Sequence, residues 1–122
     1  MESDLNKIAL NIKFDIIKEP RINAHNETII DTVKTLTYND SKIYLYRSTV
    51  KEWIYEAKIR SSEFVLLEKI NIGVEKKALE KILKTELISD ITKIGNLENT
   101  SVFIFTFKSD KLIALDYQGW ID

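Results

Sequence analysis

The stretch Ile70–Leu87, INIGVEKKALEKILKTEL, constrains the fold more than any other part of the chain. Beyond Gly73, apolar residues recur at the spacing of one helical face; they are Ala78, Leu79, Ile82, Leu83 and Leu87. Glutamates and lysines occupy the opposite face. A helix with one apolar stripe must cover another element, and the rest of the sequence offers strands. We therefore predict one main helix, Glu75–Ile88, packed on one face of a sheet.

Three segments before this helix have the residue types and the alternation of strands. They are Thr28–Tyr38, Lys42–Ser48 and Glu52–Arg60, with turn residues Asn39-Asp40-Ser41 between the first two. In the second segment, alternation places Ile43 and Leu45 on one face. In the third, the residues expected to share a face are Trp53, Tyr55, Ala57 and Ile59. The three segments predict an antiparallel meander.

The amino-terminal segment Ile8–Ile16 alternates apolar and polar residues, which favours a strand. A helix is the alternative; it would group Leu5, Ile8, Ala9, Ile12 and Ile16 on one face but leave Leu10 and Phe14 on the polar side. The following segment, Glu19–Glu27, contains Pro20 and reads as a loop.

A hairpin is predicted at the carboxy-terminal end, from Val102–Lys108 and Lys111–Tyr117 around a two-residue turn. That register puts Phe105 opposite Ala114, so Phe103, Phe105, Phe107 and Leu112 share one face. The other face then collects Val102, Ile104, Ile113, Leu115 and Tyr117. Because a bare apolar patch is uncommon on a soluble monomer, we expect the strand Ile8–Ile16 to cover it, within one chain or across a dimer.

Together these segments predict the α+β class, with an antiparallel sheet of about five or six strands and one main helix on one face. The chain has 122 residues, which suits a single domain spanning residues 1–122.

The segment from Ile70 to Leu83 and the later hairpin share a pattern with one known group of proteins. The matching residues are Ile70, Ile72, Gly73, Val74, Leu79 and Leu83, then Phe103, Phe105, Phe107, Leu112 and Ile113. The pattern resembles the β-lactamase-inhibitor-protein-like modules, a group that includes envelope lipoproteins and lipoproteins of outer-membrane assembly. The resemblance covers about the last fifty residues. It implies a non-enzymatic binding or scaffold module at the cell envelope.

Catalytic and metal chemistry find little support in the sequence. There are 0 Cys, 1 His and 3 Gly, so thiolate sites are excluded and no glycine-rich phosphate loop is present. The histidine, His25, lies in a predicted surface loop without a nucleophile motif near it. We predict no enzyme activity, no catalytic residues, no cofactor and no metal.

Aromatic residues interleaved with basic ones suggest a binding surface on the meander. The candidate protein-binding surface is Tyr44, Tyr46, Arg47, Trp53 and Tyr55. Tyr, Trp and Arg are favoured as hot spots in protein interfaces. Two alternatives stay open: bases of single-stranded nucleic acid stacked on the rings, or rings that serve the core and shield the sheet. The net charge of −1 gives no field that would attract nucleic acid, so no nucleic-acid partner is predicted.

These observations predict the soluble part of a bacterial cell-envelope lipoprotein that binds or scaffolds a protein. The alternative is a cytosolic immunity or inhibitor-type protein that binds a toxin or an enzyme. We expect the envelope or periplasm if a leader was removed, and otherwise the cytoplasm. No transmembrane span is predicted, because no apolar run approaches about 20 residues. A homodimer through the amino-terminal strand or the carboxy-terminal hairpin is a further prediction.

Overall fold

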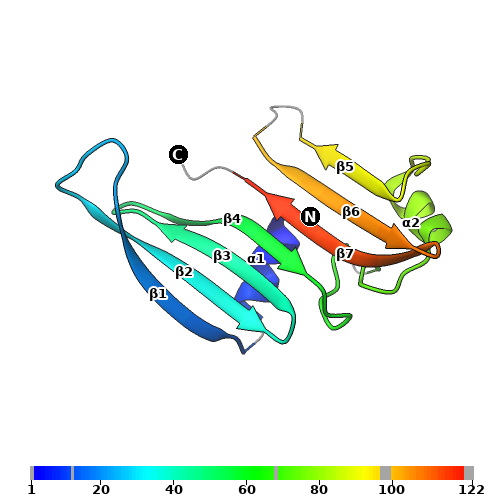
Figure 1. Cartoon of the computed structure of the whole chain (residues 1–122), viewed down its shortest axis with the longest axis horizontal. Helices are drawn as coiled ribbons and strands as arrows, with labels where there is room; N and C mark the ends of the chain where they lie inside the picture. The colour runs from blue at the N-terminus through cyan, green and yellow to red at the C-terminus, as the bar shows by residue number, and fades with distance from the viewer. Residues whose placement is uncertain (1, 12, 68, 97–99, 120–122) are drawn as a thin grey trace.

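The computed structural model describes residues 2–11, 13–67, 69–96 and 100–119. Seven strands form one antiparallel sheet in the order β1-β2-β3-β4-β7-β6-β5 (Figure 1). The elements are α1 (Glu2–Asn11), β1 (Asp15–Ile22), β2 (Ile30–Tyr38), β3 (Ser41–Arg47), β4 (Glu52–Ile59), α2 (Lys76–Leu83), β5 (Ile91–Gly95), β6 (Val102–Lys108) and β7 (Lys111–Gln118). The α+β class is confirmed, but the sheet has seven strands rather than five or six.

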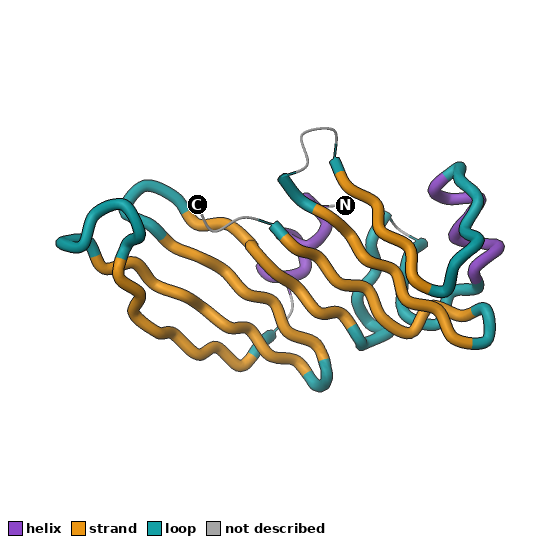
Figure 2. The backbone as a smooth tube through the Cα atoms, turned by 45° about the horizontal axis from the view of Figure 1, so that its top comes forward, coloured by secondary structure: helices purple, strands orange, loops and turns teal. Residues whose placement is uncertain are grey.

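The sheet consists of two halves, and each is a helix followed by an antiparallel meander. The first half is α1 with β1–β4, and the second is α2 with β5–β7. They meet through four residue pairs, Glu56–Ile59 with Leu115–Gln118. Both views place α1 where β4 and β7 diverge, and α2 beside the outer end of β5 and β6 (Figures 1 and 2). A single main helix is therefore not confirmed, since the described residues form two.

One face of the sheet carries the core, which runs continuously through both halves; we call it the inner face. Side chains from both helices and from the connection between β4 and α2 cover it. The residues with almost no exposed surface include Leu5, Ile43, Ile59, Phe64, Leu66, Ile70, Leu79, Phe105 and Leu112. No helix of the described residues covers the opposite side of β1–β4, which we call the outer face.

Helix α2 is shorter than the predicted Glu75–Ile88. It ends at Leu83 because Lys84 adopts a left-handed conformation with φ 55° and closes the helix through a bond from its N–H to the Glu80 carbonyl. At the other end, the Lys76 N–H donates to the Asp110 carbonyl at 2.8 Å. The helix is thereby fixed to the β6–β7 turn.

The predicted strand Ile8–Ile16 is wrong. Residues Glu2–Asn11 form α1, which buries Leu5 and Ile8 in the core and leaves Leu10 84% exposed. Ile12, which both interpretations used, lies outside the described residues. The helical grouping of Leu5 with Ile8 wins because both side chains join the core that runs through both halves of the sheet.

The predicted loop Glu19–Glu27 is wrong in its first part, because β1 continues to Ile22 and pairs with β2 along its length. Pro20 fits there because β1 is an edge strand. The Asn23 N–H donates to the Ile29 carbonyl, so alternation along the ladder turns the nitrogen of Pro20 toward the free edge, where no donor is needed.

Strands β2, β3 and β4 confirm the predicted meander, but a β-bulge changes which residues share a face. The register shifts between Tyr44 and Leu45, so Leu45 lies opposite Ile54 while Tyr44 lies opposite Glu56. Tyr55 is the extra residue on β4. The predicted set Trp53, Tyr55, Ala57 and Ile59 is wrong, because Ile54 takes the buried positions with Ala57 and Ile59.

A second bulge corrects the carboxy-terminal hairpin. The two-residue turn is confirmed, with Ser109 and Asp110 both at positive φ, but the register shifts after Phe107. Phe105 therefore lies opposite Leu115 rather than Ala114, and Leu115 and Tyr117 join the buried phenylalanines. Leu115 and Tyr117 therefore lie in the core and not in the predicted apolar patch. The patch no longer supports the predicted homodimer.

Neither helix within the described part of the chain has the length and the apolar character needed to cross a membrane.

Candidate functional site

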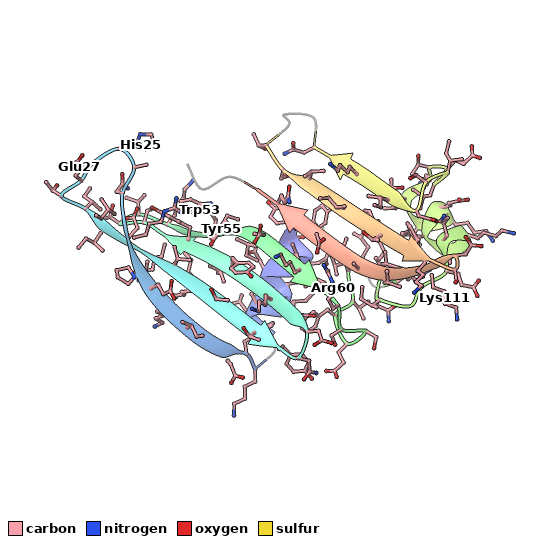
Figure 3. All side chains as sticks on the ribbon, in the orientation of Figure 1. His25, Glu27, Trp53, Tyr55, Arg60 and Lys111 are labelled. Atoms are coloured by element: carbon pink, nitrogen blue, oxygen red, sulfur yellow. The ribbon has the colours of Figure 1, made fainter. Side chains whose placement is uncertain are left out.

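Four aromatic side chains gather on the outer face of β3 and β4; we call them the aromatic surface, Tyr44, Tyr46, Trp53 and Tyr55. The ring centroids of Tyr46 and Trp53 are 5.0 Å apart, and those of Tyr44 and Tyr55 are 6.0 Å apart. Tyr46 and Trp53 are directly paired in the ladder, and the bulge brings Tyr55 to the side of Tyr44. Figure 3 labels Trp53 and Tyr55 on β4.

The fifth predicted residue, Arg47, does not join this surface. It follows Tyr46 in the strand and therefore points to the inner side, between Thr32 and Glu52 in the ladder. Two other cations take its place. The guanidinium carbon of Arg21, on β1, lies 5.8 Å from the centroid of the Tyr46 ring, and the Nζ atom of Lys51 lies 4.8 Å from that of the Trp53 ring.

A buried carboxylate anchors the centre of the surface. Asp31 on β2 is 2% exposed, and its Oδ2 atom accepts hydrogen bonds from the Tyr46 hydroxyl at 2.5 Å and from the Asn23 amide at 2.8 Å. Its Oδ1 atom is buried without a partner among the described residues. The hydrogen bond to Asp31, followed by burial and the charge of Asp31, raises the pKa of Tyr46, although Arg21 opposes the shift. Tyr46 therefore stays a protonated donor in a fixed position.

The second ring pair is less buried than the first. Tyr44 and Tyr55 both keep intermediate exposure, whereas Tyr46 is 4% exposed. Burial is the main cause that raises the pKa of Tyr55, and the nearby carboxylate of Glu56 adds to it. The aromatic surface thus combines a locked pair, Tyr46 with Trp53, and a more accessible pair, Tyr44 with Tyr55.

A cavity of about 670 Å³ adjoins the locked pair; we call it the loop cavity. The β1–β2 loop and the β3–β4 turn form its walls. The residues that line it are Arg21, Asn23, Ala24, His25, Tyr46, Ser48, Val50, Lys51, Trp53 and Gly119. Figure 3 shows His25 on the loop beyond the end of β1.

Hydrogen bonds hold both walls of the loop cavity in shape. The Asn23 side-chain oxygen accepts from the backbone N–H groups of His25 and Asn26 at 2.8 and 3.1 Å. On the other wall, the Ser48 N–H donates to the Lys51 carbonyl at 2.9 Å. The cavity is thus a feature of two closed turns, which makes it suitable for binding.

Sequence reasoning missed Arg21 and Asn23 because it assigned their segment to a loop. It missed Asp31 as well, although a signal was present: Asp31 is a lone acid in a strand otherwise rich in Ile, Val and Thr. A charge at such a position needs a polar partner on the same face. No signal in the sequence indicated that Arg21 would lie over Tyr46, because that contact depends on the pairing of β1 with β2.

Across the described residues, no three His, Cys, Asp or Glu side chains come together as a metal site would require. The predicted loop histidine, His25, is exposed in the β1–β2 loop. No protein-family model matches the chain, and no match was found among the curated proteins or the solved structures with which it was compared.

Proposed function

We propose that the protein is a non-enzymatic binding module that docks a protein partner on the aromatic surface. The observation that supports this most directly is the set of four rings on a sheet face that no helix of the described residues covers. Tyr and Trp contribute strongly to protein interfaces because they bring large area at little loss of side-chain freedom. The bond from Tyr46 to Asp31 reduces that loss further.

Protein is favoured over nucleic acid by the position of the cations. Arg21 lies over the ring of Tyr46 and Lys51 over the ring of Trp53, where a stacked base would otherwise lie. The net charge of −1 also provides no long-range attraction for a polyanion.

The proposal includes a place at the bacterial cell envelope, as the soluble part of a lipoprotein. This part rests on the resemblance of Ile70–Leu83 and the carboxy-terminal hairpin to the β-lactamase-inhibitor-protein-like modules. The gene sequence upstream of Met1 tests it. A lipoprotein signal that ends in Cys would support the envelope role, and a native start at Met1 would contradict it.

Site-specific photocrosslinking in the producing cell tests the docking surface. A benzophenone amino acid replaces Tyr44 on the outer face or, in a matched control, exposed Lys81 on α2. We expect one discrete protein adduct from position 44 that the control does not give, and we expect Tyr55→Ala to abolish it. Equal adducts from both positions, or an adduct that survives Tyr55→Ala, would place the partner elsewhere.

A further inference from the structure

Among the described residues, three cations lie over aromatic rings, and they differ in their ion pairs. Lys76 lies 5.1 Å from the Phe107 ring centroid, and its Nζ atom also pairs with Asp90 at 3.1 Å and with Asp110 at 3.8 Å. Arg21 and Lys51 have the same kind of ring contact, but neither forms an ion pair with a described carboxylate. Lys76 is therefore ion-paired, whereas Arg21 and Lys51 have no ion pair within the described residues, although Arg21 lies opposite the buried Asp31 in the ladder.

Both Arg21 and Lys51 line the loop cavity. Among the described residues, the lining contains no Asp or Glu, and the buried Asp31 is not part of it. A cavity of about 670 Å³ falls within the range of roughly 300–1,000 Å³ that is usual for small-molecule sites, and rings with a few charged groups are the usual lining.

We propose that the loop cavity binds a small aromatic carboxylate. The carboxylate lies between Arg21 and Lys51, and the flat apolar body lies along the edge of the Trp53 ring, whose face Lys51 covers. Arginine offers paired donors that match the two carboxylate oxygens, and lysine adds a second charge-assisted bond. This site goes beyond the docking of a protein on the aromatic surface, and it stands whether or not a protein binds there.

Three probes of one shape and different charge test the proposal with the full chain. Indole-3-acetate carries a carboxylate, indole-3-acetamide is its neutral counterpart, and tryptamine carries an ammonium group. Amide and indole N–H shifts in two-dimensional NMR spectra report binding at Trp53 and Arg21. We expect the acetate to bind about tenfold more tightly than the acetamide, the loss expected for one charge-assisted hydrogen bond, and tryptamine to bind least.

Two variants and a matched control assign the effect to the cavity. Arg21→Gln and Lys51→Gln should each weaken the acetate about tenfold and leave the acetamide unchanged. Lys42→Gln removes the same charge from an exposed position near the other end of β3, outside the cavity lining, and should change neither affinity. Equal affinities for the three probes overturn the proposal. The proposal is also overturned if the protein is folded but its Trp53 and Arg21 NMR signals do not shift. This negative result must hold for indole-3-acetate and for a second aromatic carboxylate, benzoate, up to the solubility limit.

Discussion

The two halves of the sheet share one plan, a helix followed by an antiparallel meander, but they differ in where their aromatic side chains and cations lie. In the half with β5–β7, three phenylalanines point into the core, and the one cation over a ring, Lys76, is ion-paired. In the half with β1–β4, four aromatic rings lie on the outer face, and the cations over two of them form no ion pair with a described carboxylate. Both halves supply the core, and the difference between them is that the first half also carries an aromatic surface on its outer face.

The largest expected effect comes from the core of the second half. Phe105 is fully buried, and Phe105→Ala should lower the free energy of unfolding by about 3–5 kcal/mol, since it leaves a cavity. Chemical denaturation followed by circular dichroism measures it. Ile113→Ala, at a 43% exposed position of the same hairpin, is the control and should change stability by less than about 0.5 kcal/mol.

The same experiment sharpens the comparison of the halves. Because one continuous core includes residues of both, Trp53 fluorescence and circular dichroism should report the same denaturation midpoint. Two separate midpoints would mean that the halves unfold independently, and the division of roles would then be one between separate units.

A smaller effect is expected at the locked ring pair of the first half. Tyr46→Phe removes the hydroxyl that donates to buried Asp31, which leaves a carboxylate short of a donor, and should cost about 1–3 kcal/mol of stability. Tyr44→Phe removes the same atom from a half-buried ring and should cost less than about 0.5 kcal/mol. Equal costs at the two positions would show that Asp31 does not anchor the surface. Thermal unfolding at neutral pH measures both.

The expected change of stability with pH is smaller than the effects of these mutations. Its sign follows from the raised pKa of Tyr46. The folded protein holds this proton more tightly than the unfolded chain, whose tyrosine pKa is near 10.0. The stabilisation is therefore complete below about pH 10 and is lost as the pH rises through the folded value. Denaturation between neutral pH and about pH 11 should show this fall, less steeply in Tyr46→Phe and unchanged in Tyr44→Phe. A fall of the same slope in Tyr46→Phe would assign it to other tyrosines.

Hydrophobic periodicity predicted the elements in which apolar residues repeat on one face. Helix α2 follows from Leu79 and Leu83, and β2, β3, β4, β6 and β7 follow from alternation and turn residues. The two bulges could not be predicted, because an extra residue such as Tyr55 leaves no trace in an alternating pattern and still reverses every face beyond it. Helix α1 was missed because Ile8–Ile16 alternates as a strand does, and the burial of Leu5 and Ile8 in the core depends on tertiary packing that this pattern does not indicate.

The candidate site was also predicted only in part. The four aromatic residues were predicted from their types and positions, and the structure brings all four together. Arg47 was grouped with them because it is adjacent in sequence, yet strand alternation turns it to the other side. Arg21 and Asp31 depend on the pairing of β1 with β2, which composition and periodicity did not indicate.

The central claim is that the first half exposes positive charge, without an ion pair among the described residues, beside its aromatic surface. Quenching of Trp53 fluorescence tests it most directly. The chain has 2 Trp, so Trp120→Phe leaves Trp53 as the one emitter. We predict that the anion iodide quenches Trp53 more efficiently than the cation caesium, and that Lys51→Gln removes most of the difference while Lys42→Gln keeps it. Equal quenching by the two ions, or stronger quenching by caesium, would contradict the account.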